Sequence, residues 1–378
     1  MQYTAPRWLP GGQAQTIWPA LFSKRYFGPR PDYRRERWDA PDGDFIDVDF
    51  AFSKASNEPK ALAQVGQLVQ VTQVALAQHP SQSGATVSAT ADKTGDGRVT
   101  QPLLVLFHGL EGSSRSHYAE AFADWAAQHG MAFAVPHFRG CSGEINRAPR
   151  AYHSGDYEEI GWILQRLKAQ QPERAIIAVG ISLGGNALLR WAQEAGDMAG
   201  RTVSAVASVC SPIDLTASGH AIGRGFNRQV YTRMFLRTMK PKALERLALH
   251  PKLFDRDKLM ASRDLYEFDN IFTGPVHGFK NTDDYWSRAS AKPHLHRIRI
   301  PALVLNALND HFVPAASLPA QHEVGSYVTL WRPPQGGHVG FAAGSLPGHV
   351  RGLPDAVGGW LAQQIQSKVL APTYAVSC

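Results

Sequence analysis

A chain of 378 residues with 44% hydrophobic and 19% charged side chains has the composition of a globular protein, which excludes a wholly disordered one. This length exceeds that of one ordinary domain, and α/β proteins often carry it as one core with an insertion. The formal net charge of +7 is concentrated between residues 219 and 263, which hold eleven Lys/Arg and three Asp/Glu. Because no nucleic-acid-binding motif accompanies these charges, we predict no nucleic-acid partner.

The three cysteines are Cys141, Cys210 and Cys378. They cannot form a closed disulfide framework, and none lies in a metal-binding spacing, so we predict a reducing compartment, no metal and no cofactor. The first 22 residues lack the basic head and unbroken apolar segment of a secretory signal. No apolar run approaches the ~18 residues of a membrane span. We therefore predict a cytoplasmic protein that does not span a membrane.

Along the chain, short apolar runs that end in glycine-rich loops alternate with helical stretches. This alternation is typical of a mostly parallel sheet with helices on both faces. Ahead of these runs, the alternating acidic and apolar residues at 44–52 predict a half-exposed antiparallel edge strand. Core strands are predicted at Leu103–Phe107, Ala132–Val135, Ala175–Val179, Val203–Val209, Ala302–Asn306 and Tyr327–Trp331. Helices are predicted at Ser116–His129, Asp156–Gln170, Gly184–Ala195 and Pro354–Gln366.

Two segments interrupt this alternation. Residues 54–101 are poor in charge, rich in Ala, Gln, Val, Ser and Thr, and predict an insertion loop between two early strands. Residues 211–290 are helical, basic and aromatic, and they fall between two core strands, where such sheets accept a lid. The predicted organisation is a core of residues 1–210 and 291–378 with an inserted helical lid of residues 211–290.

One glycine-flanked serine lies near the centre of the chain. The sequence Gly180-Ile181-Ser182-Leu183-Gly184 joins a predicted strand directly to a predicted helix. Small flanking residues allow a sharp turn there, which exposes the serine at the carboxyl edge of the sheet. This arrangement is the nucleophile elbow of the α/β-hydrolase fold, and it makes Ser182 the candidate nucleophile.

A serine hydroxyl needs a neighbouring base, and fifteen histidines compete for that role. We select His338 because it lies in a glycine-rich loop, Gln335–Phe341, just after the last predicted strand. Asp310 follows the preceding strand and is the predicted carboxylate partner of the histidine. The order serine, aspartate, histidine is the one that the α/β-hydrolase fold uses. Asp214 stays open, either as the alternative acid or as a helix cap at the start of the lid.

Ester cleavage also needs N–H donors for the tetrahedral oxyanion. We predict the backbone N–H of Leu183 and, from the loop after the strand at 103–107, the N–H of Leu110 beside Gly109. His108 in that loop is expected to be a scaffold rather than a catalytic group. Arg139 lies in the HFRGCSG segment after the next strand, where it would either bind an anionic group of the substrate or form a structural ion pair. Gly109 and Arg139 are therefore the candidate substrate-binding residues.

Six blocks of the sequence resemble one branch of the α/β-hydrolase family. They are HGLEGSSRSHYA, HFRGCSGEINR, AYHSGD, GISLGGN, FDNIFTGPVHGF followed by DDYW, and GGHVGF. The branch includes the bacterial YheT-type proteins, eukaryotic abhydrolase-domain lipid hydrolases and yeast acyltransferases that form ethyl esters. The similarity runs from WLPGGQAQTIWP to about residue 365, and it implies an esterase or lipase-like enzyme whose triad is Ser182, Asp310 and His338. Two departures are the long 54–101 insertion and His311, which follows Asp310 where proline is more usual.

We therefore expect a serine hydrolase that cleaves short- or medium-chain acyl esters or acylglycerol-like lipids through an acyl-enzyme. An alcohol O-acyltransferase that uses the same triad is an alternative. A third possibility is a lipid- or membrane-binding module, because apolar side chains interleave with the basic residues of the lid. These apolar residues are Phe226, Tyr231, Met234, Phe235 and Leu236. The expected partners are a small ester or lipid and, through the lid, a membrane surface, whereas the oligomeric state does not follow from the sequence.

Overall fold

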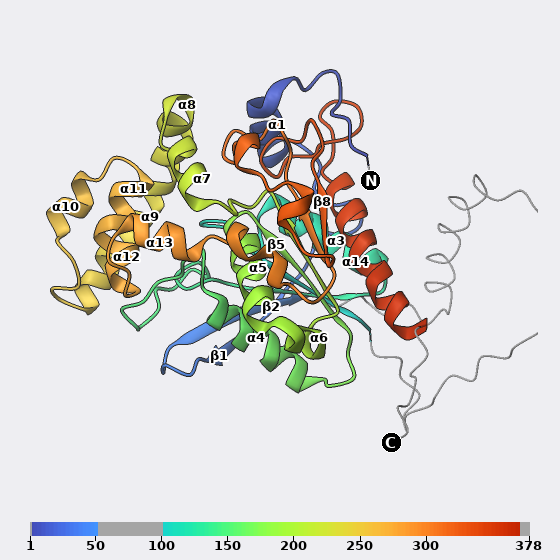
Figure 1. Ribbon diagram of the computed structural model, residues 1–378, viewed down its shortest axis with the longest axis horizontal. Coiled ribbons are helices and arrows are strands. Elements are labelled where there is room, and N and C mark those ends of the chain that lie inside the picture. Colours follow the sequence, from blue (N-terminus) through green and yellow to red (C-terminus); the bar gives the residue numbers. More distant parts are fainter. Residues whose placement is uncertain (1, 52–100, 371–378) are drawn as a thin grey trace, which may run out of the picture.

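The computed structural model describes residues 2–51 and 101–370, and its centre is an eight-stranded sheet (Figure 1). The strand order is β1-β2-β4-β3-β5-β6-β7-β8. Strands β1 and β2 run antiparallel to their neighbours, and the other six run parallel. The strands are β1 (Arg34–Asp39), β2 (Phe45–Ala51), β3 (Leu103–Phe107), β4 (Ala132–Pro136), β5 (Ile176–Ile181), β6 (Ala205–Val209), β7 (Ala302–Leu305) and β8 (Val328–Trp331).

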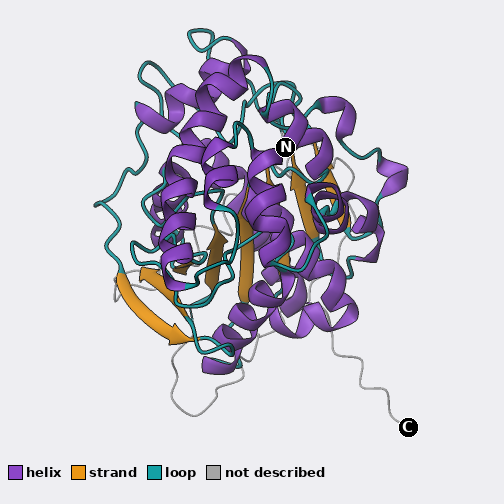
Figure 2. Cartoon of the chain, turned by 90° about the vertical axis from the view of Figure 1, so that its left-hand side faces the viewer, coloured by secondary structure: helices purple, strands orange, loops and turns teal. Residues whose placement is uncertain are grey.

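Helices cover both faces of the sheet (Figure 2). Helices α3 (His117–Gln128) and α14 (Gly352–Leu370) pack on one face, and α4 (Tyr157–Gln170) and α5 (Leu183–Ala195) pack on the other. Strands β3 to β7 are buried throughout, because a strand that is covered on both faces needs apolar side chains on both. The predicted α/β-hydrolase fold class and the six predicted core strands are confirmed.

The remaining helices lie near the chain start and between the strands. Helix α1 (Gly11–Leu21) precedes the sheet. Between β5 and β6 lie η1 (Gly196–Met198) and α6 (Ala199–Thr202), and around β7 and β8 lie η4 (Lys292–Arg297), η5 (Ala315–Ser317) and η6 (Gln321–Glu323). A helix with the length and apolar composition of a membrane span does not occur within residues 2–51 or 101–370.

A run of helices between β6 and β7 gathers on one side of the molecule (Figure 1). They are α7 (Leu215–Ile222), α8 (Gly225–Asn227), the π-helical η2 (Arg228–Thr232), α9 (Arg233–Leu249), α10 (Arg256–Ala261), α11 (Leu265–Phe268), η3 (Asp269–Thr273), α12 (Gly274–Val276) and α13 (Thr282–Ala289). This run occupies the predicted lid segment, and its action as a lid stays a prediction. The predicted 54–101 insertion lies outside the described residues except for residue 101.

The predicted antiparallel strand at 44–52 is confirmed as β2, but its half-exposed position at the edge of the sheet is wrong. Strand β2 is buried along nearly its whole length, and β1, which was not predicted from the sequence, forms the edge. The acidic side chains of β2 are buried because β1 supplies arginines to them. Arg37 donates to Asp47 at 2.8 Å, and Arg35 donates to Asp49 at 2.7 Å. The acidic residues that alternate with apolar ones in β2 therefore pair with arginines of β1 instead of facing water.

The Asp49 carboxylate gives a prediction about acid stability. Burial alone would raise the pKa of Asp49, but hydrogen bonds from Arg35, His137 and Ser114 outweigh it and hold the pKa well below its usual value of 3.8. A carboxylate with a lowered folded-state pKa stabilises the fold above the unfolded-state pKa, and the contribution is lost as the pH falls. We expect Asp49→Asn to lower the free energy of unfolding by about 2 kcal/mol at pH 7, and by clearly less at pH 3.

Urea denaturation of both proteins at the two pH values measures this difference. Asp257→Asn, at a carboxylate whose side chain is 89% exposed, is the matched control and should change the midpoint little at either pH. A difference between Asp49→Asn and the unsubstituted protein that stays constant between pH 7 and pH 3 would contradict the account.

Candidate active site

Ser182 lies in a strained turn between β5 and α5. Its backbone has φ 53° and ψ −120°, a conformation that non-glycine residues rarely adopt. The first turn of α5 approaches the neighbouring strands too closely for larger residues. A Cβ added to Gly184 would lie 2.4 Å from the carbonyl oxygens of Phe107 and His108. Such strain is typical of functional sites, and here it holds the serine hydroxyl above the carboxyl edge of the sheet.

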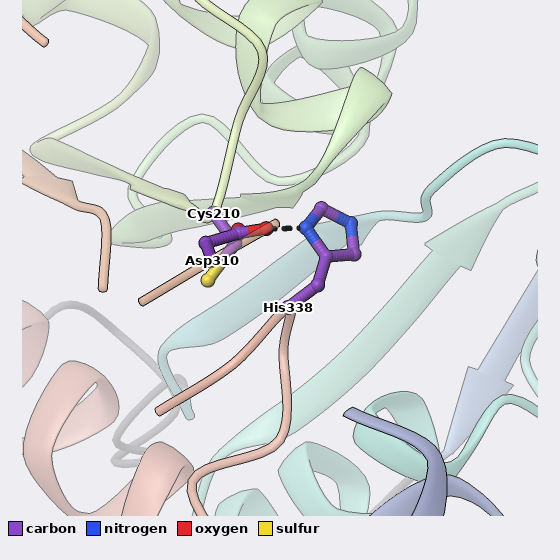
Figure 3. Close-up of side chains that lie close together, drawn as sticks. All are labelled: Cys210, Asp310 and His338. Carbon is purple, nitrogen blue, oxygen red and sulfur yellow. Dashed lines mark hydrogen bonds and ion pairs between the residues drawn. The ribbon is translucent and has the colours of Figure 1, made fainter. Parts of the chain in front are cut away.

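The structure brings together the three side chains that the sequence predicted as nucleophile, base and acid. His338 Nε2 lies 3.0 Å from Ser182 Oγ. On the other side of the ring, His338 Nδ1 lies 2.8 Å from Asp310 Oδ2 (Figure 3). Because Asp310 is a carboxylate, Nδ1 carries the hydrogen and donates it, which leaves Nε2 to accept from the serine hydroxyl. The second oxygen of Asp310 accepts from the backbone N–H of Phe312 at 2.8 Å. These contacts form one continuous hydrogen-bonded chain.

The loop that carries His338 is held by helix α1. Thr16 Oγ1 accepts from the His338 backbone N–H at 2.8 Å. Gln15 Oε1 accepts at 2.9 Å both from the Gly336 N–H and from the Asn309 side chain. Neither Gln15 nor Thr16 was predicted from the sequence to support the site. Both residues lie in the WLPGGQAQTIWP block, which resembles the family, but nothing in that block indicates that its side chains bond to a loop more than 300 residues away.

Cys210 directly follows β6 and lies beside Asp310 and His338 (Figure 3). Its Sγ accepts from the Val339 N–H at 3.3 Å and lies 3.7 Å from the Gly337 carbonyl, so it contacts the backbone on both sides of His338. Burial raises the pKa of the Cys210 thiol well above its usual value. Donor atoms of Cys210, Asp310 and His338 lie within 4.8 Å of one another, a set that could hold a metal ion. The absence of a metal from the site stays a prediction.

Asp214, the alternative acid, caps a helix. Its Oδ1 accepts from the Ala217 N–H at 3.0 Å at the start of α7, and Oδ2 lies 3.9 Å from Lys292 Nζ. The carboxylate bonded to His338 is instead that of Asp310. Of the two possibilities left open for Asp214, the geometry is that of the helix cap.

His311, at the position where proline is more usual, packs its ring against aromatic neighbours. The His311 ring stacks on Tyr231 with centroids 5.1 Å apart and meets Phe312 edge-on at 4.6 Å. Burial lowers the pKa of His311 to about 4, so the ring is neutral at physiological pH. The departure from the family pattern therefore leaves the Asp310 loop able to present its carboxylate to His338.

The two predicted oxyanion donors lie beside the serine. Leu110 and Leu183 line the same cavity as Ser182, and their backbone N–H groups have no acceptor among the described residues. Gly109 permits this close approach, because an added Cβ would lie 3.3 Å from Ser182 Cβ. N–H groups without an acceptor in a cavity that holds a serine hydroxyl are the kind of donors that oxyanion stabilisation requires. Their roles in oxyanion and substrate binding stay predictions.

His108 holds the loop in place. It is fully buried, its Nδ1 lies 2.8 Å from the Gly109 carbonyl, and its Nε2 accepts from the Phe138 N–H at 3.1 Å. Burial lowers the pKa of His108 to about 3, so the ring is neutral. Because both ring nitrogens bond to backbone groups, His108 has the role predicted for it, which is to support the loop.

A cavity of about 650 Å3 opens over Ser182 and His338. Its walls come from α1, the loop after β3 and the helices between β6 and β7, and they are mainly apolar. They include Ile17, Leu215, Ile222, Phe235, Phe268 and Phe272. An apolar cavity with a few polar groups at one end is typical of a small-molecule site, and this one suits an extended apolar group.

Residues 102–344 match the family model of the α/β-hydrolase fold. The chain belongs to the α/β-hydrolase-fold family. This α/β hydrolase is 33% identical to YheT of Escherichia coli K12, which is provisionally named an esterase, over 94% of this chain and 91% of that protein. It is 27% identical to the human phospholipase ABHD3 over 66% of this chain, and it spans 60% of that protein.

A solved structure has the same fold at low sequence identity. The crystal structure of 2,6-dihydroxy-pseudo-oxynicotine hydrolase superimposes with a TM-score of 0.52 and 15% identity, over 91% of this chain and 71% of that one. At this identity the likeness is one of fold alone. The suspected membership of the YheT-type branch is confirmed, and the relatives carry esterase and lipase-type names.

Arg139 of this α/β hydrolase is enclosed by carboxylates. Its guanidinium lies 2.6 Å from Glu159, 2.9 Å from Asp44 and 2.9 Å from Asp42, and the arginine side chain is almost fully buried. Burial and the neighbouring Asp156 raise the pKa of Glu159 to about 7. Of the two roles predicted for Arg139, these contacts are those of a structural ion pair. A contact between Arg139 and substrate stays a prediction.

Removing the Arg139 guanidinium should therefore affect folding more than substrate binding. Arg139→Ala leaves buried carboxylates without their cation, so we expect the free energy of unfolding to fall by about 3 kcal/mol. The KM for a small neutral ester should change little in the folded variant. Urea denaturation and steady-state kinetics measure the two effects. Arg256→Ala, which removes an exposed ion pair with Asp257, is the control and should cost under about 1 kcal/mol. Unchanged stability with a tenfold higher KM would favour the substrate contact.

Proposed function

We propose that this α/β hydrolase cleaves carboxylic esters with an apolar acyl group, with Ser182 as nucleophile, His338 as general base and Asp310 as the acid that orients the histidine. The observation that carries the proposal is the hydrogen-bonded chain of these three side chains at the wall of an apolar cavity. The esterase and phospholipase names of its relatives support an ester as the bond that is cleaved.

The proposed reaction begins with attack of Ser182 Oγ on the ester carbonyl carbon while His338 Nε2 takes the hydroxyl proton. The negative charge develops on the carbonyl oxygen, which receives hydrogen bonds from the N–H groups of Leu110 and Leu183. The protonated His338 then gives its proton to the leaving alkoxide, and an alcohol departs from the acyl-enzyme. Water repeats the sequence and releases the carboxylic acid, which restores Ser182. Asp310 stabilises the imidazolium in both halves of the cycle.

A pair of matched substitutions tests the assignment of the acid. Asp310→Asn keeps the shape of the side chain but no longer fixes the tautomer of His338, so we expect kcat to fall by about 10³-fold or more. Asp214→Asn removes a carboxylate at a helix cap, and we expect kcat within about threefold of the unsubstituted enzyme. Turnover of p-nitrophenyl butyrate measures both. Equal losses in the two variants, or a larger loss in Asp214→Asn, would reject Asp310 as the acid.

The apolar walls of the cavity predict how activity depends on the acyl group. Burial of each further methylene is worth up to about 0.8 kcal/mol, which corresponds to about fourfold in kcat/KM while space remains. We therefore expect kcat/KM for p-nitrophenyl esters to rise steadily from acetate through butyrate to octanoate. A series in which acetate is the best substrate would contradict the proposed acyl-binding role of the cavity.

A further inference from the structure

Helix α9 carries basic residues on two sides, and the two sides have different partners. On one side Lys242 Nζ lies 2.7 Å from Glu111, and Arg246 donates to backbone carbonyl groups of the core. This side ties the helix to the loop beside Ser182. On the other side Arg233 and Arg237 are exposed, and neither has an ion pair with any residue that the structure describes. The second side is therefore positively charged and faces solvent.

The unpaired arginines belong to a basic groove of about 480 Å3. Its walls hold five cationic side chains: Arg228, Arg233, Arg237, Lys240 and Arg263. The Lys240 ammonium is fixed by the carbonyls of Met260 and Ser262, at 2.8 Å and 2.6 Å. Glu267 is an acid close to the groove, where its carboxylate accepts from the backbone N–H of Arg263. No carboxylate is among the lining residues, so the groove carries an excess of positive charge, which attracts anions.

An exposed apolar stripe runs beside the basic groove. Phe226, Val230 and Met234 recur every four residues, so they share one side of the continuous helical run α8–η2–α9. They are 54%, 37% and 52% exposed, and Leu21 at the end of α1 is 63% exposed. Val230, Met234 and Leu21 also line the cavity that reaches Ser182, so these exposed side chains stand at its opening. A group of exposed apolar side chains at a cavity opening marks an interaction surface.

We propose that the basic groove and the apolar stripe together dock this protein on an anionic phospholipid bilayer. The arginines would lie against the anionic headgroups while the apolar side chains enter the membrane interface, as in other amphipathic interfacial helices. A nucleic acid would match the cations but would leave the apolar stripe in water. Docking turns the cavity opening toward the bilayer, so a lipid ester reaches Ser182 without crossing bulk water. That consequence rests on the proposed function, whereas the docking contacts do not involve Ser182.

Co-sedimentation of the full chain with vesicles tests the docking surface. We expect much stronger binding to phosphatidylcholine vesicles that contain phosphatidylglycerol than to phosphatidylcholine alone. The double substitution Arg233→Gln/Arg237→Gln should weaken binding to the anionic vesicles about tenfold or more, because each basic residue at the surface contributes several-fold. The control Arg256→Gln/Lys258→Gln removes the same charge from α10, outside the groove, and should leave binding within about twofold. Phe226→Ser should also weaken vesicle binding, because it shortens the apolar stripe.

Turnover of p-nitrophenyl butyrate, a soluble ester, separates docking from folding and from catalysis. Both double variants should keep this turnover, and Ser182→Ala should lose it while it still binds anionic vesicles. For the unsubstituted chain, binding to the anionic vesicles should fall as salt is raised, which tests the electrostatic contribution without any substitution. Equal vesicle binding by the groove and control variants, equal binding to both kinds of vesicle, or preference for duplex DNA over anionic vesicles would overturn the proposal. If Ser182→Ala keeps its turnover, the proposed function fails while the docking proposal stands.

Discussion

The hydrogen bond between His338 Nδ1 and Asp310 is the contact on which the site depends, because it sets which ring nitrogen faces Ser182. The three side chains come from the β5–α5 turn and from the loops after β7 and β8, which open at the same edge of a parallel sheet. Sheet topology brings these distant stretches of chain together, and finer contacts fix the ring. Thr16 accepts from the His338 N–H, and Cys210 contacts the backbone of the neighbouring Gly337 and Val339, so the protein itself positions the imidazole.

Two sets of charges serve different purposes in this molecule. Inside, acidic residues of β2 and around Arg139 are buried with cations, where an unpaired charge would be costly. Outside, no carboxylate lines the basic groove, and five of the eleven Lys/Arg between residues 219 and 263 line it. Helix α9 joins the two sets, since Lys242 reaches Glu111 in the loop beside the candidate nucleophile. The basic groove and the cavity over Ser182 are therefore lined by residues of the same helix.

The elements that could be predicted from the sequence are those whose residue pattern fits only one structural environment. The apolar runs of β3 to β7 fit only strands covered on both faces, and the glycines around Ser182 fit only a turn with close backbone contacts. Alternating acidic residues in β2 fit either water or arginine partners, and the sequence of the partner strand, RRERWD, has no apolar pattern that marks it as a strand. The supports from Gln15 and Thr16 could not be predicted, because polar side chains give no sign of partners so far along the chain.

We infer that the hydroxyl of Ser182 is activated by its position in the folded protein. Reaction with a fluorophosphonate, followed by mapping of the modified peptide by mass spectrometry, tests this claim directly. We expect a single adduct on Ser182, formed rapidly by the folded chain, far more slowly by His338→Ala, and not at all after unfolding in urea. An adduct on a different residue, or equal labelling of the folded and unfolded chains, would contradict it.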